Sequence, residues 1–510
     1  MIQLETKIKL PFLWGKASFN KRIWNSINLI VGPNGSGKTL LAEELKNQFE
    51  KKGYDATFLR SDRTNEEELL GVLRTDSVVR EKIEGVLSNM FGKSIRFEEK
   101  EDGSFVPIVV NKTRGVEYSL KEGECHGLKE ILILLIALYG CFTKLLIVDE
   151  PELHLHPQFQ QFFMNEIRRV SESEPERIFF LVTHSPYFID LRFAEDLLGV
   201  VVCHVNRIPT FIDELSDNDE NLLRRFLPRF NTYHKQFFFS DNQVFVEGYT
   251  DQQMFSNLLS CVDNRNGTAG TGIIDVGGKD ELGVFFKVCA LLGTDTRIIT
   301  DLDSLFCGKL REEAFEDLRP ANWLYAQEEK QETFYASLFT RRELESSVTL
   351  EKLVRRLEIF IVNIGKFVSG VDGSVSSEVD TFVEKVHELY DKYEKPESLD
   401  TFKTVVLQAV FLLGNKLDVF LPRHLAETIP VIVNLTNLIL AAFESAKIFI
   451  LSKGCIEHYY VESKVLYMPI SGKDRLFHNE LESMVEKTPN DLKKNYAQLI
   501  SILNRACARN

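Results

Sequence analysis

The feature that most constrains this chain is the octapeptide GPNGSGKT at residues 32–39. It follows the apolar segment INLIV and precedes the helical pattern LLAEELKNQF, so it lies between a strand and a helix. A glycine-rich turn in this context directs successive backbone N–H groups toward a phosphate at the helix N-terminus. Its lysine reaches the β and γ phosphates, and its threonine supplies a hydroxyl to Mg²⁺. We therefore predict an ATP site at Asn34, Gly35, Ser36, Gly37, Lys38 and Thr39.

A second segment, LLIVDE at residues 145–150, has the pattern of a buried strand that ends in two carboxylates. Asp149 would hold the Mg²⁺ of the nucleotide, and Glu150 would position and activate the attacking water. Either carboxylate alone could be a surface residue at a strand end. Together with the upstream glycine-rich turn, the pair predicts the second half of an ATP-hydrolysing site.

Composition restricts the class of protein. At ~100 to 200 residues per domain, the 510 residues predict two to four domains. Hydrophobic residues make up 44% and charged residues 27%, which is typical of a soluble globular protein. A net charge of -14 argues against a general nucleic-acid coat but leaves room for a local basic groove.

The longest apolar run, at 131–142, is short of the ~20 residues that cross a bilayer, and the N-terminus lacks a signal-peptide pattern. The eight cysteines show no C-x-x-C spacing. We expect a cytoplasmic protein without membrane association.

Strand-like and helix-like segments alternate through most of the chain, which predicts an α/β fold with buried parallel strands. The pattern weakens over residues 208–231, so we place a first domain at 1–235 and a second at 236–510. Strands are replaced by amphipathic helices from about 308 to 446, and a last strand follows at 446–451. These helices are therefore expected to be an insertion within the second α/β domain. The other expected strands are 28–31, 144–148, 177–182, 198–204, 243–246, 272–276 and 296–300.

Four carboxylates follow strands of the second domain. Glu247 ends one strand, and Asp251 lies one helical turn later. Asp301 and Asp303 end another strand, and alternation along an extended chain would point both the same way. The carboxyl ends of parallel strands meet at one edge of a sheet, where open α/β folds bind ligands. Hard oxygen ligands suit Mg²⁺ or Mn²⁺, and two such ions can assist a phosphodiester displacement.

The nucleotide motifs resemble those of the ABC-type ATPases of the SMC, RecF and OLD group. VDEPELHLHP at 148–157 is similar to the Walker B motif and D-loop of that group, and THSP at 183–186 is similar to the end of its switch strand. The resemblance implies that His184 senses the γ-phosphate. His154 and His156 form an H-x-H that could indicate zinc, but the group carries similar residues there and no further ligands stand at zinc spacing.

The signature segment is less regular. LKEGE at 120–124 stands where the group has LSGGQ, and no glutamine occurs between Gln48 and Gln158 to serve as the Q-loop residue. These departures argue against fast ATP turnover and favour a regulatory nucleotide. In this group the signature, here with Gly123, contacts the nucleotide of a second subunit. The resemblance therefore implies a homodimer or a higher even homo-oligomer.

The second domain resembles a TOPRIM domain, on VFVEGYTD at 244–251 and ITDLDS at 299–304. IDVGGK at 274–279 and ILSKGCIE at 450–457 are similar to segments of the OLD (overcoming lysogenization defect) nucleases, as in Gabija and retron anti-phage systems.

This likeness implies roles for Lys453 and Glu457 of the segment 450–457, and no catalytic role for Lys279 of the segment 274–279. Lys453 would donate charge to the scissile phosphate or leaving oxygen, and Glu457 would complete the metal ligation. Lys279 is expected to be a turn lysine that contacts DNA or solvent.

The leading hypothesis is an ATP-regulated, metal-dependent DNA endonuclease, with a partner protein or a retron RNA–DNA hybrid as a possible further partner. The alternative is a DNA-sensing or DNA-repair ATPase whose TOPRIM domain is only a binding scaffold. Concentrated, mutually repelling carboxylates favour the nuclease. A topoisomerase would need a nucleophilic tyrosine in a recognisable motif, and a primase would usually add a zinc site. The expected catalytic residues are Glu150, Glu247, Asp301 and Lys453. The expected metal ligands are Glu247, Asp251, Asp301, Asp303 and Glu457, with Thr39 and Asp149 at the nucleotide.

Overall fold

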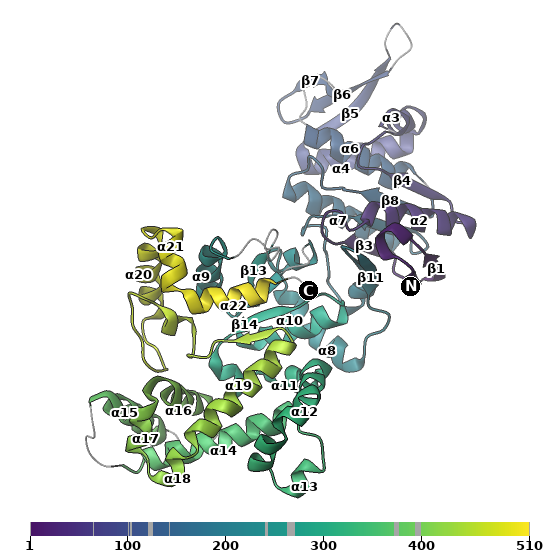
Figure 1. Cartoon of the computed structure of the whole chain (residues 1–510). Helices are drawn as coiled ribbons and strands as arrows, with labels where there is room; N and C mark the ends of the chain where they lie inside the picture. The colour runs from purple at the N-terminus through teal and green to yellow at the C-terminus, as the bar shows by residue number, and fades with distance from the viewer. Residues whose placement is uncertain are drawn as a thin grey trace. The chain divides into compact units, whose positions relative to one another are not determined.

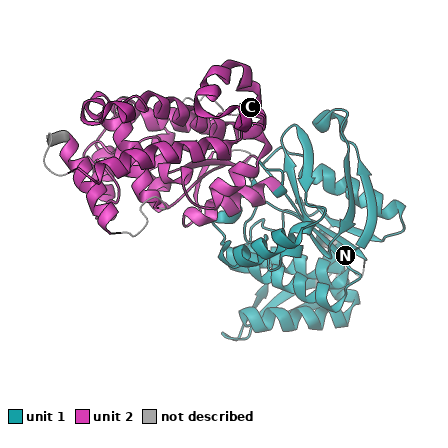
Figure 2. Ribbon diagram, turned by 90° about the horizontal axis from the view of Figure 1, so that it is seen from below, with its two compact units in different colours: residues 1–241, 291–294 teal, residues 242–290, 295–510 magenta. Residues whose placement is uncertain are grey.

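The computed structural model describes residues 2–64, 66–99, 101, 105–120, 126–141, 143–239, 243–262, 271–371, 377–392 and 399–508. The chain forms two compact units (Figure 2). Unit 1 comprises residues 1–241 and 291–294, and unit 2 comprises 242–290 and 295–510.

The core of unit 1 is a six-stranded sheet with the order β11-β10-β3-β9-β8-β4 (Figure 1). Five of its strands are parallel, and β11 pairs antiparallel with β10 at one edge. Every residue of β8, β9 and β10 is buried, as expected for parallel strands covered on both faces. The strands are β3 (Ile27–Val31), β4 (Ala56–Leu59), β8 (Leu145–Asp149), β9 (Ile178–Val182), β10 (Val200–His204) and β11 (Arg207–Phe211).

Helices and two small antiparallel sheets complete unit 1. Phe49 of α2 packs edge-on against Phe180 of β9, with ring centroids 5.7 Å apart, so the helix after the glycine-rich turn is held against the sheet. The main helices are α2 (Lys38–Lys51), α3 (Glu66–Thr75), α4 (Ser77–Phe91), α6 (His126–Gly140), α7 (Pro157–Ser173) and α8 (Asp217–Phe226). In one small sheet β1 (Ile2–Ile8) pairs with β2 (Phe19–Trp24). In the other, β6 (Phe105–Asn111) lies in the middle and pairs with β5 (Lys93–Glu99) and β7 (Val116–Ser119).

Unit 2 is built on a four-stranded parallel sheet with the order β13-β12-β14-β15. Its apolar core includes side chains from this sheet, from α9 and from the C-terminal helices. The strands are β12 (Gln243–Val246), β13 (Gly272–Asp275), β14 (Arg297–Thr300) and β15 (Ile448–Ile450). The helices around them are α9 (Tyr249–Leu259), α10 (Lys279–Leu291), α20 (Lys473–Val485), α21 (Pro489–Asn495) and α22 (Ala497–Cys507).

A helical insertion separates β14 from β15, which are neighbours in the sheet (green in Figure 1). Within it, α14 and α16 pack closely because Gly365 has no side chain. A Cβ there would lie 2.4 Å from Cζ of Phe402. The longer helices are α11 (Lys309–Glu316), α12 (Leu318–Leu338), α14 (Leu350–Val368), α15 (Ser377–Asp391), α16 (Asp400–Leu413), α17 (Asn415–Phe420) and α19 (Ile429–Ser445).

These elements confirm the expected α/β class and the helical insertion, and each expected strand occurs within about two residues of its predicted position. One detail differs. Residues 207–211, near the expected domain boundary, form the edge strand β11, because this short segment pairs with β10 instead of leaving the sheet.

One described helix is long and apolar enough to cross a membrane by length and composition. It covers Arg423–Ser445, and 39% of the most apolar 18-residue window within it is buried inside the protein. Charged and polar residues break its apolar run, which is why the sequence analysis did not single it out. Its C-terminal part, α19, packs against α12, α14 and β15.

Candidate nucleotide and metal sites

The glycine-rich turn of unit 1 is shaped for a phosphate. Gly32 has a positive φ of 140°, and a Cβ there would lie 2.2 Å from the carbonyl oxygen of Cys203, so only glycine allows this approach to β10. Helix α2 begins at Lys38 without a side-chain hydrogen bond to its cap, so its first N–H groups face the turn. The Lys38 ammonium donates to the carbonyls of Gly32 (3.1 Å) and Pro33 (2.9 Å). The expected lysine therefore lies inside the turn.

The carboxylates at the end of β8 meet this turn. Thr39 Oγ1 donates to Asp149 Oδ2 at 3.0 Å, and Asp149 Oδ1 is buried without a hydrogen-bond partner among the described residues. Burial raises the pKa of Asp149, opposed by the Thr39 hydroxyl. The hydroxyl and the free carboxylate oxygen suit a hard cation such as Mg²⁺.

Arg63, which sequence reasoning missed, holds the backbone around Glu150. Its Nε and Nη2 contact Glu130 Oε1 at 2.6 and 2.5 Å. Nη1 donates to the carbonyls of Arg60 (2.5 Å) and Asp149 (2.9 Å), and Nη2 donates to the Glu150 carbonyl at 3.0 Å. The guanidinium thus donates four hydrogen bonds, three of them to backbone carbonyls, and also forms an ion pair with Glu130. The loop after β4 and helix α6 are thereby joined to the end of β8.

Glu150 is fixed in an unfavourable backbone conformation. Its φ is 48°, in the left-handed region that few residues other than glycine adopt. Its N–H donates to the Val182 carbonyl at 2.8 Å, while its own carbonyl is held by Arg63. Strain that the surroundings enforce is typical of functional positions.

Glu152 links this turn to the expected γ-phosphate sensor. Its carboxylate accepts from Thr183 Oγ1 (2.7 Å) and from the His184 N–H (2.6 Å). Burial, together with the nearby Lys38, lowers the pKa of His184 to about 4, so the imidazole is neutral near pH 7. Of the H-x-H pair, His156 caps α7 by accepting from the Gln158 N–H at 3.3 Å. Among the described residues no three His, Cys, Asp or Glu side chains already stand close enough together to hold a metal ion, and this includes the carboxylates of unit 2 described below, which a cation would have to draw together.

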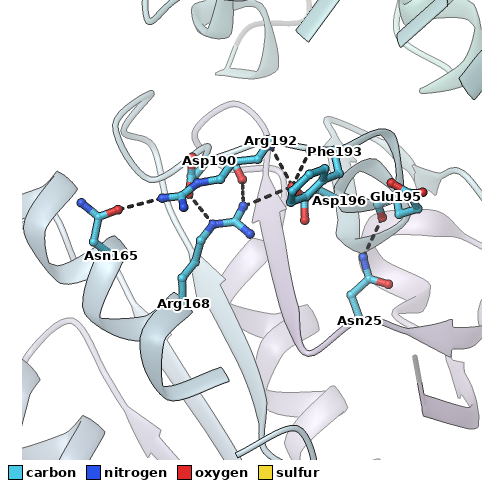
Figure 3. Close-up of polar contacts among 8 residues, drawn as sticks. All are labelled: Asn25, Asn165, Arg168, Asp190, Arg192, Phe193, Glu195 and Asp196. Carbon is cyan, nitrogen blue, oxygen red and sulfur yellow. Dashed lines mark hydrogen bonds and ion pairs between the residues drawn. The ribbon is translucent and has the colours of Figure 1, made fainter. Parts of the chain in front are cut away.

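A polar network fastens the segment that follows the sensor to α7 (Figure 3). Arg168 reaches from α7 to the Asp190 carboxylate and, at 3.2 Å, to Asp196. Arg192 contacts Asp190 (2.9 Å) and Asn165 (2.8 Å). His184 is therefore held from two sides. Glu152 accepts a hydrogen bond from its N–H, and the network of Arg168 and Arg192 fixes the segment that follows it. The expected signature residue Gly123 lies outside the described residues.

Unit 2 gathers its carboxylates at the carboxyl-terminal edge of the sheet. Glu247 follows β12, and Asp251 lies in the first turn of α9, where it accepts from the Gly248 N–H at 3.1 Å. Asp301 follows β14, and Asp303 lies in the 3-10 turn Leu302–Leu305. Glu457 lies in a second 3-10 turn after β15. The strand alternation expected for Asp301 and Asp303 is wrong, because β14 has already ended and a turn sets their directions.

The charges of this cluster act on one another. Burial, then Asp251, Glu247, Asp303 and Glu457, raise the pKa of Asp301 well above its usual value. Burial, Glu247 and Glu457 raise the pKa of Asp251 to about 7. Burial and then Asp303 raise the pKa of Glu247. The five carboxylates thus form one electrostatic unit, in which ionisation of all members needs added positive charge.

Two lysines supply part of that charge. Lys279, expected to be a turn lysine, pairs with Asp303 at 2.5 Å. Lys473, which the sequence analysis did not consider, pairs with Glu457 at 3.1 Å. Burial would raise the pKa of Glu457, but the Cys455 thiol and Lys473 lower it below its usual value. The ammonium of Lys453 lies 5.0 Å from the ring centroid of Tyr459.

The donor set of this edge fits a divalent cation. Glu247 Oε2 and Glu457 Oε2 are buried and have no hydrogen-bond partner among the described residues. Unpaired, buried carboxylate oxygens are the ligands that Mg²⁺ and Mn²⁺ prefer. The residues that would hold such ions are Glu247, Asp251, Asp301, Asp303 and Glu457.

Loss of Arg63 should unfold the centre of unit 1. Arg63→Ala leaves Glu130 buried and unpaired, which typically costs about 3–5 kcal/mol. Arg60→Ala is the control, because its pair with Glu43 is largely exposed (2.9 Å) and worth less than about 1 kcal/mol. We expect Arg63→Ala, but not Arg60→Ala, to lower the unfolding temperature and ATP affinity together, as measured by thermal denaturation and calorimetry. Equal stability of the two variants would show that the contacts of Arg63 with Glu130 and with the backbone at Asp149 and Glu150 do not stabilise unit 1.

Two segments of the chain match models of known protein families. Residues 238–303 match the family model "Overcoming lysogenization defect protein-like, TOPRIM domain". Residues 43–190 match "AAA domain, putative AbiEii toxin, Type IV TA system".

Two curated relatives share part of the chain. The OLD nuclease of Thermus scotoductus is 26% identical over 191 residues, 36% of either chain. The Old nuclease of Escherichia phage P2 is 25% identical over 169 residues, 32% of this chain and 28% of the relative. The matched part thus spans about a third of the length of these relatives. Among solved structures, the SMC head domain from Thermotoga maritima aligns with 42% of this chain and 100% of its own, at 12% identity and a TM-score of 0.30. The two matched domains and the two relatives support an ATPase–TOPRIM protein that is similar to the OLD family.

Proposed function

We propose that the protein is an ATP-regulated DNA endonuclease that depends on Mg²⁺ or Mn²⁺ and serves as a cytoplasmic anti-phage effector. The observation that carries this proposal is the cluster of five carboxylates at one edge of the unit 2 sheet, with lysines at its border. A binding scaffold gains nothing from concentrating repelling charges. The name of the two relatives, nuclease, supports the same chemistry.

The residues of unit 2 divide the work of phosphodiester cleavage. Bound divalent cations would supply Lewis acidity to the phosphate and to the attacking water. Two such cations would be held by five carboxylates: Glu247, Asp251, Asp301, Asp303 and Glu457. Lys473 keeps positive charge at the edge where the phosphate gains negative charge in the transition state. Lys453 approaches the same loop from the side of Tyr459.

Unit 1 controls this reaction. Lys38 and Thr39 would hold the phosphates and their Mg²⁺. The hydrogen bond from Arg63 fixes the backbone of Glu150, whose carboxylate would activate water. Gly123 completes the nucleotide site of a second copy, so the active form is a homodimer or a higher even homo-oligomer. The nucleotide changes cleavage only if it favours one arrangement of the copies over another. A partner protein or a retron RNA–DNA hybrid would be a further partner that holds the enzyme inactive.

Removal of the aspartates should abolish cleavage. The double variant Asp301→Ala, Asp303→Ala loses two ligands at once, so plasmid nicking with Mg²⁺ or Mn²⁺ should disappear while ATP hydrolysis continues. Chelation of metal should reproduce the loss. Asp295→Ala, which removes an exposed carboxylate at the opposite end of β14, should leave nicking unchanged. Metal-dependent nicking by the double variant would return the protein to the DNA-organising ATPase alternative.

The two lysines can be separated by rate. Removing one electrostatic contact to a transition state typically costs ~10² to 10³ in rate, so Lys473→Ala should slow nicking by that amount. Lys453→Ala tests the residue that the family resemblance indicates. A comparable loss would show that both ammonium groups act on the phosphate. A loss confined to Lys453→Ala would remove Lys473 from the site.

Nucleotide control should depend on Lys38. Lys38→Ala leaves the phosphate charge unbalanced in the turn, so ATP binding should be lost and cleavage should no longer respond to ATP. Lys46→Ala is the matched control on α2, because its ammonium pairs with Glu50 on the helix surface. Calorimetry and nicking assays with and without ATP measure both effects. An intact ATP response in Lys38→Ala would show that regulation uses another site.

A further inference from the structure

The helical insertion reaches the carboxylate cluster through Gln408 of α16. This side chain is fully buried. Its Nε2 donates to the carbonyl of Lys453 at 2.7 Å and lies 3.2 Å from Nε2 of His458. Both partners belong to the segment after β15, which also carries Glu457. A side chain of the insertion is therefore bonded directly to a loop of the site.

The peptide group next to the one that Gln408 holds is bonded to the aspartate turn. The Gly454 carbonyl accepts from the N–H of Leu302 at 2.8 Å, and Leu302 stands between Asp301 and Asp303. Gly454 has a φ of 132°, and a Cβ there would lie 2.1 Å from Gln408 Nε2. Only glycine can fill this gap, so the segment is confined between the amide of Gln408 and the backbone of the turn.

The same helix also supports the aspartate turn. Helix α16 packs against the 3-10 turn Leu302–Leu305, and the Lys403 ammonium lies 5.6 Å from the ring centroid of Phe306. Lys403 is held in place by Glu358 of α14 at 3.1 Å. The insertion thus contacts both loops that bring carboxylates in from β14 and β15.

We propose that Gln408 is a positioning residue through which the insertion sets the spacing between Glu457 and the aspartates of the β14 turn, and hence the affinity for divalent cations. This inference rests on the proposed metal-dependent function. Without the amide donor, the partly buried Lys453 carbonyl loses this partner and the segment at Gly454 can shift. Loss of a group that orients metal ligands typically costs 10- to 100-fold in metal affinity, about the size expected here.

The test compares two buried positions of α16 in the full chain. Gln408→Met keeps a long side chain and removes the donor. Thr404→Val is the matched control, because Thr404 is also fully buried but donates only to the Asp400 carbonyl within its own helix, at 2.7 Å. We expect calorimetric titration with Mn²⁺, without DNA, to show a ~10- to 100-fold loss for Gln408→Met and no change for Thr404→Val. In the metal-free protein, the Leu302 amide should exchange hydrogen faster only in Gln408→Met.

Each outcome decides one question. Parent-like Mn²⁺ affinity in folded Gln408→Met, or an equal loss in Thr404→Val, overturns the positioning role. If Gln408→Met does not fold, Gln408→Asn, whose shorter amide cannot reach Lys453, replaces it with the same expectation. The Asp301→Ala, Asp303→Ala variant separates this inference from the proposed function. A parent that binds Mn²⁺ no tighter than that variant refutes the metal centre itself.

Discussion

Repulsion among carboxylates at one sheet edge is the constraint around which unit 2 is arranged. Parallel pairing of β12, β14 and β15 brings the loops that carry these groups together, and burial removes the water that would screen them. Lysine side chains at the start of two helices offset part of this repulsion. Lys279 is the first residue of α10 and Lys473 the first of α20, so each ammonium adds to the positive end of a helix dipole. Lys279 pairs with Asp303 and Lys473 pairs with Glu457, so positive charge at both helix starts opposes the repulsion among the carboxylates.

In unit 1 the structure fixes the backbone of Glu150, the residue that we propose to activate water. Glu150 has a left-handed backbone, which costs free energy unless its neighbours enforce it. The Val182 carbonyl fixes its N–H, and Arg63 fixes its carbonyl while also binding Glu130 of α6. The helix that follows the signature segment and the end of β8 are thereby parts of one hydrogen-bonded assembly.

The sequence predicts the parts of this protein that local patterns determine. Apolar runs indicated the strands, and the glycine-rich turn and the carboxylates at strand ends indicated both sites. It could not reveal Arg63, Glu152, Lys473 or Gln408, because each acts on residues far along the chain. Arg63 meets Asp149, and Gln408 meets Lys453, only after the strands have paired. Lys279 was expected to face DNA or solvent, yet it pairs with Asp303, since the start of α10 lies beside the aspartate turn.

The insertion enters after β14 and returns at β15, which are adjacent strands, so its two ends stand close together. This placement divides the five carboxylates by origin. Asp301, Asp303 and Glu457 lie beside the two ends of the insertion, whereas Glu247 follows β12 and Asp251 lies in α9. A displacement of α16 would reach Asp301, Asp303 and Glu457 through the backbone of the two loops that it contacts, and would reach Glu247 and Asp251 only through their charges.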